Sequence, residues 1–245
     1  MTGGEVSGPT PIRRIDTFAF ARTGSHLFRY CTMGLFDRVE IPRPDNMEVE
    51  SRQEEIEPAA LHALSLREEG VPYSPIAFNT RATGQHGFPE KGSDPMVVLI
   101  RDPIPTFYSF FKVTTERWNQ AIEDPATWLR AKCERYIAFY DTAFKQIATS
   151  PSDSLLIRYE DLIASPEPLY ELVSLVGIRP KLSPLFVHPI TRFDSFTRPG
   201  KRTFYRSGDN AAWKADPQWC DILLRADLPD LARFEQPSPR KGDGM

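Results

Sequence analysis

Three things are scarce in this chain of 245 residues: an excess charge of one sign, cysteine, and long apolar runs. Its 30 Lys and Arg residues stand against 33 Asp and Glu residues, which leaves a net charge of −3. No broad positive field is therefore available to attract nucleic acid or an anionic membrane. The longest apolar runs are far shorter than the roughly 18 residues of a membrane-spanning helix, so none is predicted. An anionic ligand would have to be bound by a local cluster of positive groups.

The three cysteines, Cys31, Cys133 and Cys220, are too few and too widely spaced for a disulfide framework or a zinc motif. The opening residues 1–11 are rich in Gly, Ser, Thr and Pro and contain no apolar signal core. Both features are typical of a protein of the reducing cytoplasm, which is the location that we expect.

A composition of 40% hydrophobic and 26% charged residues is that of a globular protein. We predict one domain over residues 12–235, with disordered ends at 1–11 and 236–245. Inside the domain, short apolar runs typical of buried parallel strands alternate with amphipathic helical patterns. The predicted strands are 15–20, 75–79, 96–100 and 155–159, and the helical patterns cover 107–118, 129–147 and 169–176. The alternation predicts an α/β fold, with a parallel β-sheet flanked by helices.

Three helix starts carry the same signal, an aspartate followed by a proline. The pairs are Asp102-Pro103, Asp124-Pro125 and Asp216-Pro217. Aspartate is a favoured N-cap and proline is favoured at the first helical position. We therefore expect each carboxylate to cap the helix that follows it.

The turn after the first predicted strand carries anion-binding chemistry. It contains Arg22, Thr23, Gly24, Ser25 and His26. A glycine lets the backbone approach a ligand closely, and the free amides of a helix N-terminus face an anion. Two hydroxyls would add donors, and the arginine would add charge. An ordinary capped turn is the alternative, because no Walker motif, Gly-x-x-x-x-Gly-Lys-Ser/Thr, is present.

Two further segments carry possible anion-binding residues. The first follows a predicted strand end, and the second lies in a basic loop. Arg101 follows the 96–100 strand, and Ser109 lies eight residues further on, about two helical turns away. These two side chains would meet one anion only if the ligand lay along the helix start. The late segment contains Phe204, Arg206, Ser207 and Gly208, and Trp213 and Lys214 follow it. A capped helix with a surface arginine and a solvated loop are the alternatives, but together the segments indicate a ligand with two separate phosphates.

These segments resemble the motifs of the sulfotransferases that use 3′-phosphoadenosine 5′-phosphosulfate (PAPS). Arg22-Thr23-Gly24-Ser25 resembles the family's 5′-phosphosulfate loop, and Arg101, Asp102-Pro103 and Ser109 resemble its 3′-phosphate motif. Residues 156–162 resemble its Tyr-Glu-Asp-Leu strand, in which Tyr159 would contact the adenine. Phe204, Arg206, Gly208, Trp213 and Lys214 resemble its late motif, although Ser207 replaces the usual lysine and Ala211 a glycine.

The resemblance implies a P-loop-nucleotide-hydrolase-like sulfotransferase fold and transfer of a sulfuryl group from PAPS to a hydroxyl or amine, without a metal. The acceptor would be a small molecule or a glycan. Arg22 would act as the catalytic electrostatic clamp. The donor would be bound by residues of all the motifs: Arg22, Thr23, Gly24, Ser25, His26, Arg101, Ser109, Tyr159, Phe204, Arg206, Ser207 and Gly208.

The general base is the least determined part of the predicted site. Where the family has a Lys-Thr-His motif, Arg81 takes the place of the histidine, and His86 lies five residues later in a Gly-flanked loop. His86 is our candidate base, and a glutamate of the acidic stretch 48–57 is the alternative. Two other functions stay open. A P-loop kinase or nucleotidase would need Mg²⁺ and a Walker lysine, and a non-catalytic module would bind 3′-phosphoadenosine nucleotides without turnover.

Overall fold

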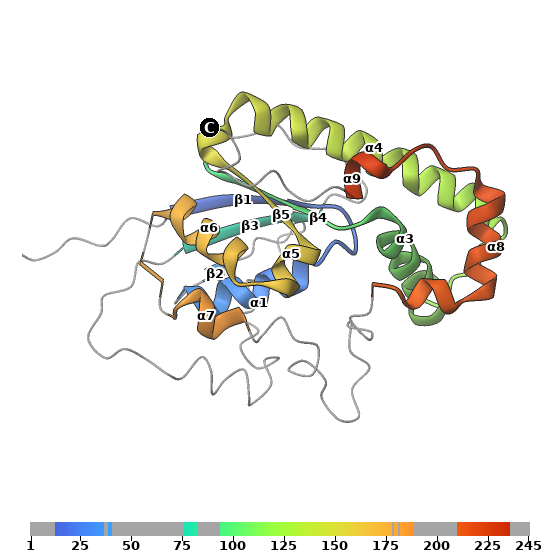
Figure 1. Cartoon of the computed structure of the whole chain (residues 1–245), viewed down its shortest axis with the longest axis horizontal. Helices are drawn as coiled ribbons and strands as arrows, with labels where there is room; N and C mark the ends of the chain where they lie inside the picture. The colour runs from blue at the N-terminus through green and yellow to red at the C-terminus, as the bar shows by residue number, and fades with distance from the viewer. Residues whose placement is uncertain are drawn as a thin grey trace, which may run out of the picture.

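The computed structural model describes residues 13–36, 39–40, 76–82, 94–177, 179–180, 182–188 and 210–235. Its centre is a sheet of five parallel strands in the order β2-β3-β1-β4-β5 (Figure 1). The strands are β1 (Arg13–Ala19), β2 (Val39–Glu40), β3 (Ile76–Ala82), β4 (Met96–Ile100) and β5 (Ser154–Arg158). This confirms the predicted α/β fold with a parallel sheet, and the four predicted strands lie within two or three residues of their expected bounds.

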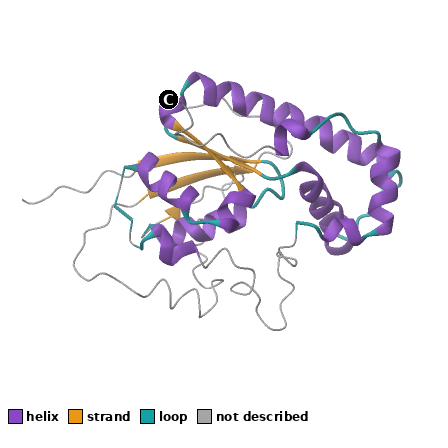
Figure 2. Cartoon of the chain, in the orientation of Figure 1, coloured by secondary structure: helices purple, strands orange, loops and turns teal. Residues whose placement is uncertain are grey.

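Helices cover both faces of the sheet (Figures 1 and 2). One group packs on one face: α1 (Ser25–Leu35), α5 (Tyr159–Ala164), α6 (Glu167–Val176) and α7 (Pro184–Val187). The other group covers the opposite face and extends beyond the strand ends: α3 (Pro103–Lys112), α4 (Pro125–Thr149), α8 (Pro217–Ala226) and α9 (Ala232–Glu235). Shorter helical segments are the π-helical η2 (Val113–Arg117) and the 3-10 turns η3 (Pro151–Asp153) and η6 (Ala212–Ala215).

Burial on both faces of the sheet explains why strand β4, the neighbour of the central strand β1, is apolar throughout. In β4, Val97 and Leu99 point into the core under α1 and α6, while Met96, Val98 and Ile100 point into the core under α4. Successive side chains of a strand alternate between faces, so a strand covered on both sides needs an apolar residue at every position. All five are buried, and β4 therefore holds a fixed position from which its carboxyl end presents the next residue, Arg101.

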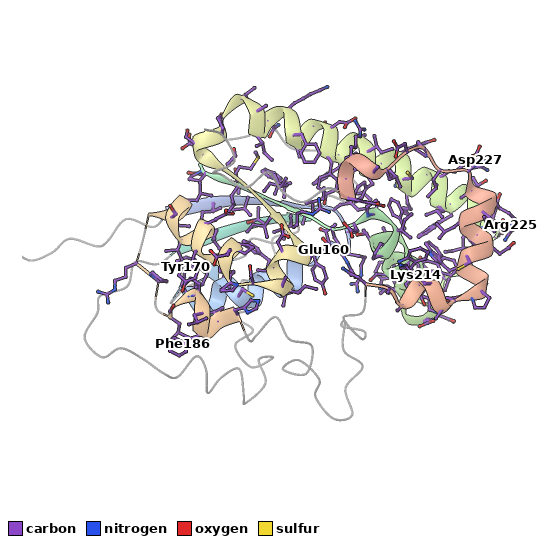
Figure 3. The ribbon with its side chains drawn as sticks, viewed as in Figure 1. Glu160, Tyr170, Phe186, Lys214, Arg225 and Asp227 are labelled. Carbon is purple, nitrogen blue, oxygen red and sulfur yellow. The ribbon has the colours of Figure 1, made fainter. Side chains whose placement is uncertain are left out.

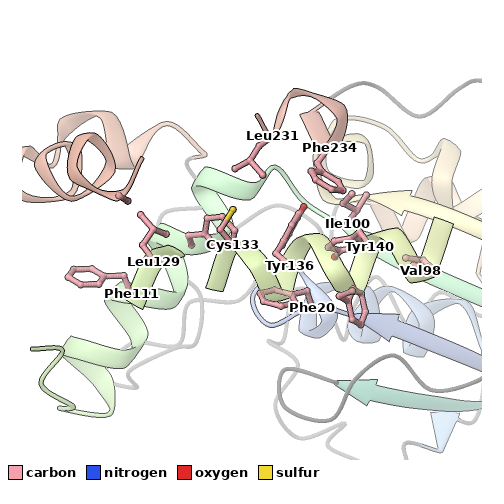
Figure 4. Close-up of a cluster of buried hydrophobic side chains, with 14 of the residues drawn as sticks. Phe20, Val98, Ile100, Phe111, Leu129, Cys133, Tyr136, Tyr140, Leu231 and Phe234 are labelled. Atoms are coloured by element: carbon pink, nitrogen blue, oxygen red, sulfur yellow. The ribbon is translucent and has the colours of Figure 1, made fainter. Parts of the chain in front are cut away.

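Tyrosines of α4 fasten this helix to the end of β4. Tyr136 packs edge-on against Phe107, with ring centroids 5.3 Å apart, and its hydroxyl donates to the Arg101 carbonyl at 2.6 Å. The hydroxyl of Tyr140 donates to the Leu99 carbonyl at 2.5 Å. Figure 4 shows both tyrosines within the buried cluster that also contains Phe20. Because buried hydroxyls need partners, these rings serve both the apolar core and the backbone at the strand end.

Two of the three predicted aspartate caps are confirmed. The Asp124 side chain accepts hydrogen bonds from two backbone amides at the start of α4, and the Asp216 side chain accepts one at the start of α8. The prediction for Asp102 is wrong, because its side chain makes no cap to α3. Its Oδ1 instead accepts from Nη2 of Arg158 at 2.6 Å. The Arg158 guanidinium is buried, and leaving it without an anionic partner would cost more than leaving a helix end uncapped.

The end of α6 follows the sequence signal closely. The helix stops at Gly177, which has a φ of 65° and whose amide bonds to the Val173 carbonyl. A left-handed residue at this place is favourable for glycine. Among the described residues, no helix is long and apolar enough to cross a membrane. The predicted disordered ends, 1–11 and 236–245, lie outside the described residues.

Candidate functional site

The loop between β1 and α1 is shaped by two left-handed residues, Arg22 with a φ of 73° and Gly24 with a φ of 94°. Helix α1 then begins at Ser25, and its first turn lies at the carboxyl end of the central strands. A non-glycine residue with positive φ is uncommon and has to be held by its surroundings. Here the Arg22 carbonyl accepts a hydrogen bond from Arg101 Nη1 at 3.3 Å. The loop thus places a helix N-terminus, which attracts anions, beside two arginines.

Thr23 shapes this loop rather than adding a free donor to it. Its hydroxyl donates to the Phe20 carbonyl at 2.7 Å, and its amide donates to the same carbonyl at 3.3 Å. Thr23 is also buried, so in this structure its hydroxyl is engaged within the loop. That Thr23 contacts the donor stays a prediction. Ser25 is half-buried at the start of α1. The His26 side chain lies outside the described part of the chain.

Gly24 makes room for the ring of Tyr159. A Cβ atom on Gly24 would lie 2.6 Å from Cδ2 of Tyr159, closer than any ordinary contact. Tyr159 was expected to end a strand, but β5 stops at Arg158 and Tyr159 starts α5. The Arg101 guanidinium carbon lies 4.4 Å from the Tyr159 ring centroid, a cation–π distance. The tyrosine ring therefore links the glycine of the loop to the arginine that follows β4.

Arg101 is the residue to which most parts of the site connect. Its Nε donates to Oδ1 of Asn210 at 3.1 Å, and its Nη2 donates to the same oxygen. Burial lowers the pKa of Arg101, while Tyr159, Glu160 and Asp102 act in the opposite direction. An arginine stays protonated in spite of such a shift, so its positive charge persists in a partly buried place.

Ser109 lies near the middle of α3, and its Oγ accepts a hydrogen bond from Arg22 Nε at 3.2 Å. It therefore meets Arg22 directly, whereas Arg101 meets the Arg22 carbonyl. The structure thus brings three predicted residues, from two distant parts of the chain, to one place at the carboxyl ends of β1 and β4. Two guanidinium groups and a hydroxyl at this place make a candidate anion site.

An acidic network lies behind this anion site, where β4 and β5 end. Glu160 Oε1 accepts from the Asp102 amide at 3.2 Å and from Nδ2 of Asn210 at 3.0 Å. Burial, and then the neighbouring Asp102, raise the pKa of Glu160. Figure 3 shows Glu160 at the start of α5, beside the strand ends. Glu160 lay in the predicted Tyr-Glu-Asp-Leu motif without an assigned role. Asn210 was missed, since a polar residue in a turn carries no signal of its own.

Several predicted site residues are not located by this structure. His86, Phe204, Arg206, Ser207 and Gly208 lie outside the described residues, as does the acidic stretch 48–57. Trp213 and Lys214 are described and lie within η6, with the Lys214 ammonium 5.6 Å from the Trp213 ring centroid. Within the described ranges, no group of three or more His, Cys, Asp or Glu side chains is arranged to hold a metal ion.

The contact between Gly24 and Tyr159 leads to a double-mutant prediction. Gly24→Ala should lower thermal stability for two reasons, strain at a positive φ of about 1 kcal/mol and the collision with the ring. In a Tyr159→Ala background the collision is absent, so Gly24→Ala should cost clearly less there. Thermal unfolding of the four proteins measures the difference. Equal costs in both backgrounds would show that the ring does not press on Gly24.

No protein-family model matches the sequence, and no curated protein matches it. Solved structures do. The structure of mouse sulfotransferase SULT7A1 complexed with PAP superimposes with a TM-score of 0.55 at 14% identity, over 87% of this chain and 82% of that one. The sulfotransferase domain of the Synechococcus PCC 7002 olefin synthase has a TM-score of 0.50 at 15% identity, over 98% of this chain and all of that one. At such identities the likeness concerns the fold, and it confirms at that level the resemblance predicted from the motifs: this chain has a sulfotransferase fold.

Proposed function

We propose that this protein transfers a sulfuryl group from PAPS to a hydroxyl or amine of a small-molecule or glycan acceptor. The observation that supports this most is the convergence of Arg22, Arg101 and Ser109 at the carboxyl ends of the central strands. These are the positions at which the motifs resemble the two phosphate sites of the family. The SULT7A1 structure that shares the fold is complexed with PAP, the desulfated form of the donor.

The donor would lie across the ends of β1 and β4. The backbone amides at the start of α1, with Arg22, would hold the 5′-phosphosulfate. Arg101 and Ser109 would hold the 3′-phosphate, and Tyr159 would contact the adenine. The late motif, with Phe204, Arg206, Ser207 and Gly208, would complete the nucleotide site. Two phosphate positions separated by a nucleoside account for anion-binding residues on two different strand ends.

The proposed reaction is an in-line displacement at sulfur. The acceptor oxygen or nitrogen forms a bond to sulfur, the bond between sulfur and the 5′-phosphate oxygen breaks, and PAP leaves with the electron pair. As in phosphoryl transfer, a loose transition state makes positioning and charge stabilisation the main contributions of the protein. Arg22 would neutralise charge on the leaving phosphate oxygens, and its hydrogen bond to Ser109 would orient the guanidinium. His86 would take the acceptor proton.

The two other functions have less support. A kinase or nucleotidase would leave Arg101 and Ser109 without a purpose, and the loop contains no Walker lysine. A non-catalytic module would bind PAP by the same residues and would differ only in lacking a base.

The cytoplasm remains our proposed location. Cys31 and Cys133 are buried free thiols, and burial raises their pKa to about 12 and about 11, which keeps them protonated. We propose no role for nucleic acid.

The assignment of the 3′-phosphate to Arg101 can be tested by ligand comparison. Arg101→Ala should weaken PAP binding by about 10- to 100-fold, the effect of losing hydrogen bonds to a charged group. Binding of 5′-AMP should fall much less, because this nucleotide has no 3′-phosphate. Titration calorimetry measures both affinities. Arg225→Ala, which removes the same charge from an exposed position of α8, is the matched control. Equal losses for the two nucleotides would refute the assignment.

The assignment of the base to His86 can be tested by separating turnover from binding. His86→Ala should abolish sulfuryl transfer from PAPS to a panel of phenol, sterol and glycan acceptors. Its affinity for PAP should stay within about twofold of that of the unaltered protein, since a base contacts the acceptor rather than the donor. His62→Ala serves as a matched control. Near-normal turnover of the His86 variant would place the base elsewhere, first in the acidic stretch 48–57.

A further inference from the structure

Asn210 contacts Arg101 in a way that no sequence motif indicated. Two donors of the guanidinium, Nε and Nη2, point to a single acceptor, Oδ1 of Asn210, with the Nε bond at 3.1 Å. These two atoms form one of the edges with which an arginine usually grips a carboxylate or phosphate. The third nitrogen, Nη1, donates to the Arg22 carbonyl at 3.3 Å. The guanidinium plane is therefore fixed from two sides, and protons of Nη1 and Nη2 are left for a ligand.

The orientation of the Asn210 amide is determined by its two neighbours. Its oxygen faces the guanidinium, and its Nδ2 donates to Glu160 Oε1 at 3.0 Å. The reversed orientation would set an NH₂ group against a cation and an oxygen against a carboxylate, which is repulsive at both ends. Glu160 is itself fixed by the Asp102 amide at 3.2 Å. The amide thus has one satisfactory orientation. The hydrogen bonds run in one direction, from the Arg101 guanidinium to the Asn210 amide and from this amide to the Glu160 carboxylate.

The residue that fixes Arg101 carries no charge, although acidic groups lie close to it. The Asp102 carboxylate is bound to Arg158 at 2.6 Å, and Glu160 faces the amide rather than the guanidinium. None of the ion pairs among the described residues includes Arg101. A carboxylate at position 210 would give an ion pair with Arg101 and would cancel the charge that attracts an anion.

We propose that Asn210 is a positioning residue for the donor site: its neutral amide orients Arg101 while leaving the positive charge of the guanidinium to the 3′-phosphate. This inference rests on the proposed function and deepens it, because it names what makes the site specific for nucleotides with a 3′-phosphate. Its consequence is that charge at position 210, not only shape, decides how well the protein distinguishes PAP from 5′-AMP.

Asn210→Asp separates these two properties, because aspartate has nearly the same shape. A carboxyl oxygen would replace Nδ2 beside Glu160 Oε1, and two carboxylates at such a distance share a proton until the pH is high enough to remove it. Burial and Asp102 already raise the pKa of Glu160. Removal of the shared proton adds a negative charge against Arg101. The side chain at position 210 contacts Arg101 and Glu160. The charged and titratable groups that interact with these two are Asp102, Tyr136, Tyr140, Arg158 and Tyr159, and Arg22 interacts with Tyr159.

The experiment measures the affinity of the protein for PAP and for 5′-AMP by calorimetry at several pH values from about 6 to 9. The preference for PAP is the ratio of the affinity for PAP to the affinity for 5′-AMP. The preference of each variant is divided by that of the unaltered protein at the same pH, and this cancels the effect of ionisation of the ligands themselves. Asn210→Asp should reduce the preference by about 10- to 100-fold at the alkaline end, and the deficit should shrink as the pH falls. Asn210→Ala should reduce it less and without dependence on pH. Asn119→Asp, at an exposed loop position, is the matched control and should leave the preference unchanged.

Each outcome decides something. If the unaltered protein has no preference for PAP, both the proposed function and this inference fail. If it prefers PAP and Asn210→Asp retains the full preference at alkaline pH, only the inference fails. Equal, pH-independent deficits in the aspartate and alanine variants would show that Asn210 acts through shape alone, which also contradicts the inference. Thermal unfolding of each variant verifies that the protein is folded. If the aspartate variant does not fold, the alanine variant takes its place in the comparison with the unaltered protein.

Discussion

A partly buried guanidinium requires hydrogen-bond partners for the edges that water does not reach, and Arg101 is the group on which the arrangement of this site depends. One of its partners is the carbonyl of Arg22, in the loop after β1. Another is Asn210, which enters from the last part of the chain. The ring of Tyr159, from the start of α5, lies against it. Satisfying one side chain therefore joins segments that are separated by more than 180 positions in the sequence.

The sheet supplies the rigidity that this arrangement needs. Because β4 is covered on both faces, its end cannot shift without disturbing two cores. The hydroxyls of Tyr136 and Tyr140 donate hydrogen bonds to the backbone carbonyls of Arg101 and Leu99 at the end of β4. Helix α4 therefore fixes the backbone from which the Arg101 side chain projects. Placing binding residues on strand ends rather than on long loops keeps them precise, and it is the usual place for ligands in parallel sheets.

Features that depend on neighbouring residues in the sequence could be predicted, whereas features that depend on distant residues could not. The apolar run 96–100 and the glycine at 177 determine structure through their own neighbours, and the structure confirms both. The spacing of Arg101 and Ser109 alone allowed a shared site only if the ligand lay along the helix start, and it was the resemblance of their motif to the family's that predicted one. The prediction for Asp102 was wrong. Its local signal was that of a helix cap, but a buried arginine 56 residues away competes for the same carboxylate.

Asn210 illustrates the other limit of sequence reasoning. Its importance comes only from what lies opposite it, a guanidinium on one side and a carboxylate on the other. A turn asparagine in a sequence has many ordinary explanations. Thr23 is similar, since a hydroxyl beside a glycine predicts a ligand contact as readily as the turn-closing bond that the structure contains. Fold and motif positions were predictable because they are periodic or closely spaced, whereas long-range polar pairs were not.

The most direct test of the account is calorimetric binding of PAP to the unaltered protein, compared with binding of ATP in the presence of Mg²⁺. We predict tight binding of PAP and no measurable binding of ATP, because in the proposed site Arg101 and Ser109 would hold a 3′-phosphate and the loop lacks a Walker lysine. Tight binding of ATP with Mg²⁺ and none of PAP would contradict the donor assignment and favour a kinase or nucleotidase.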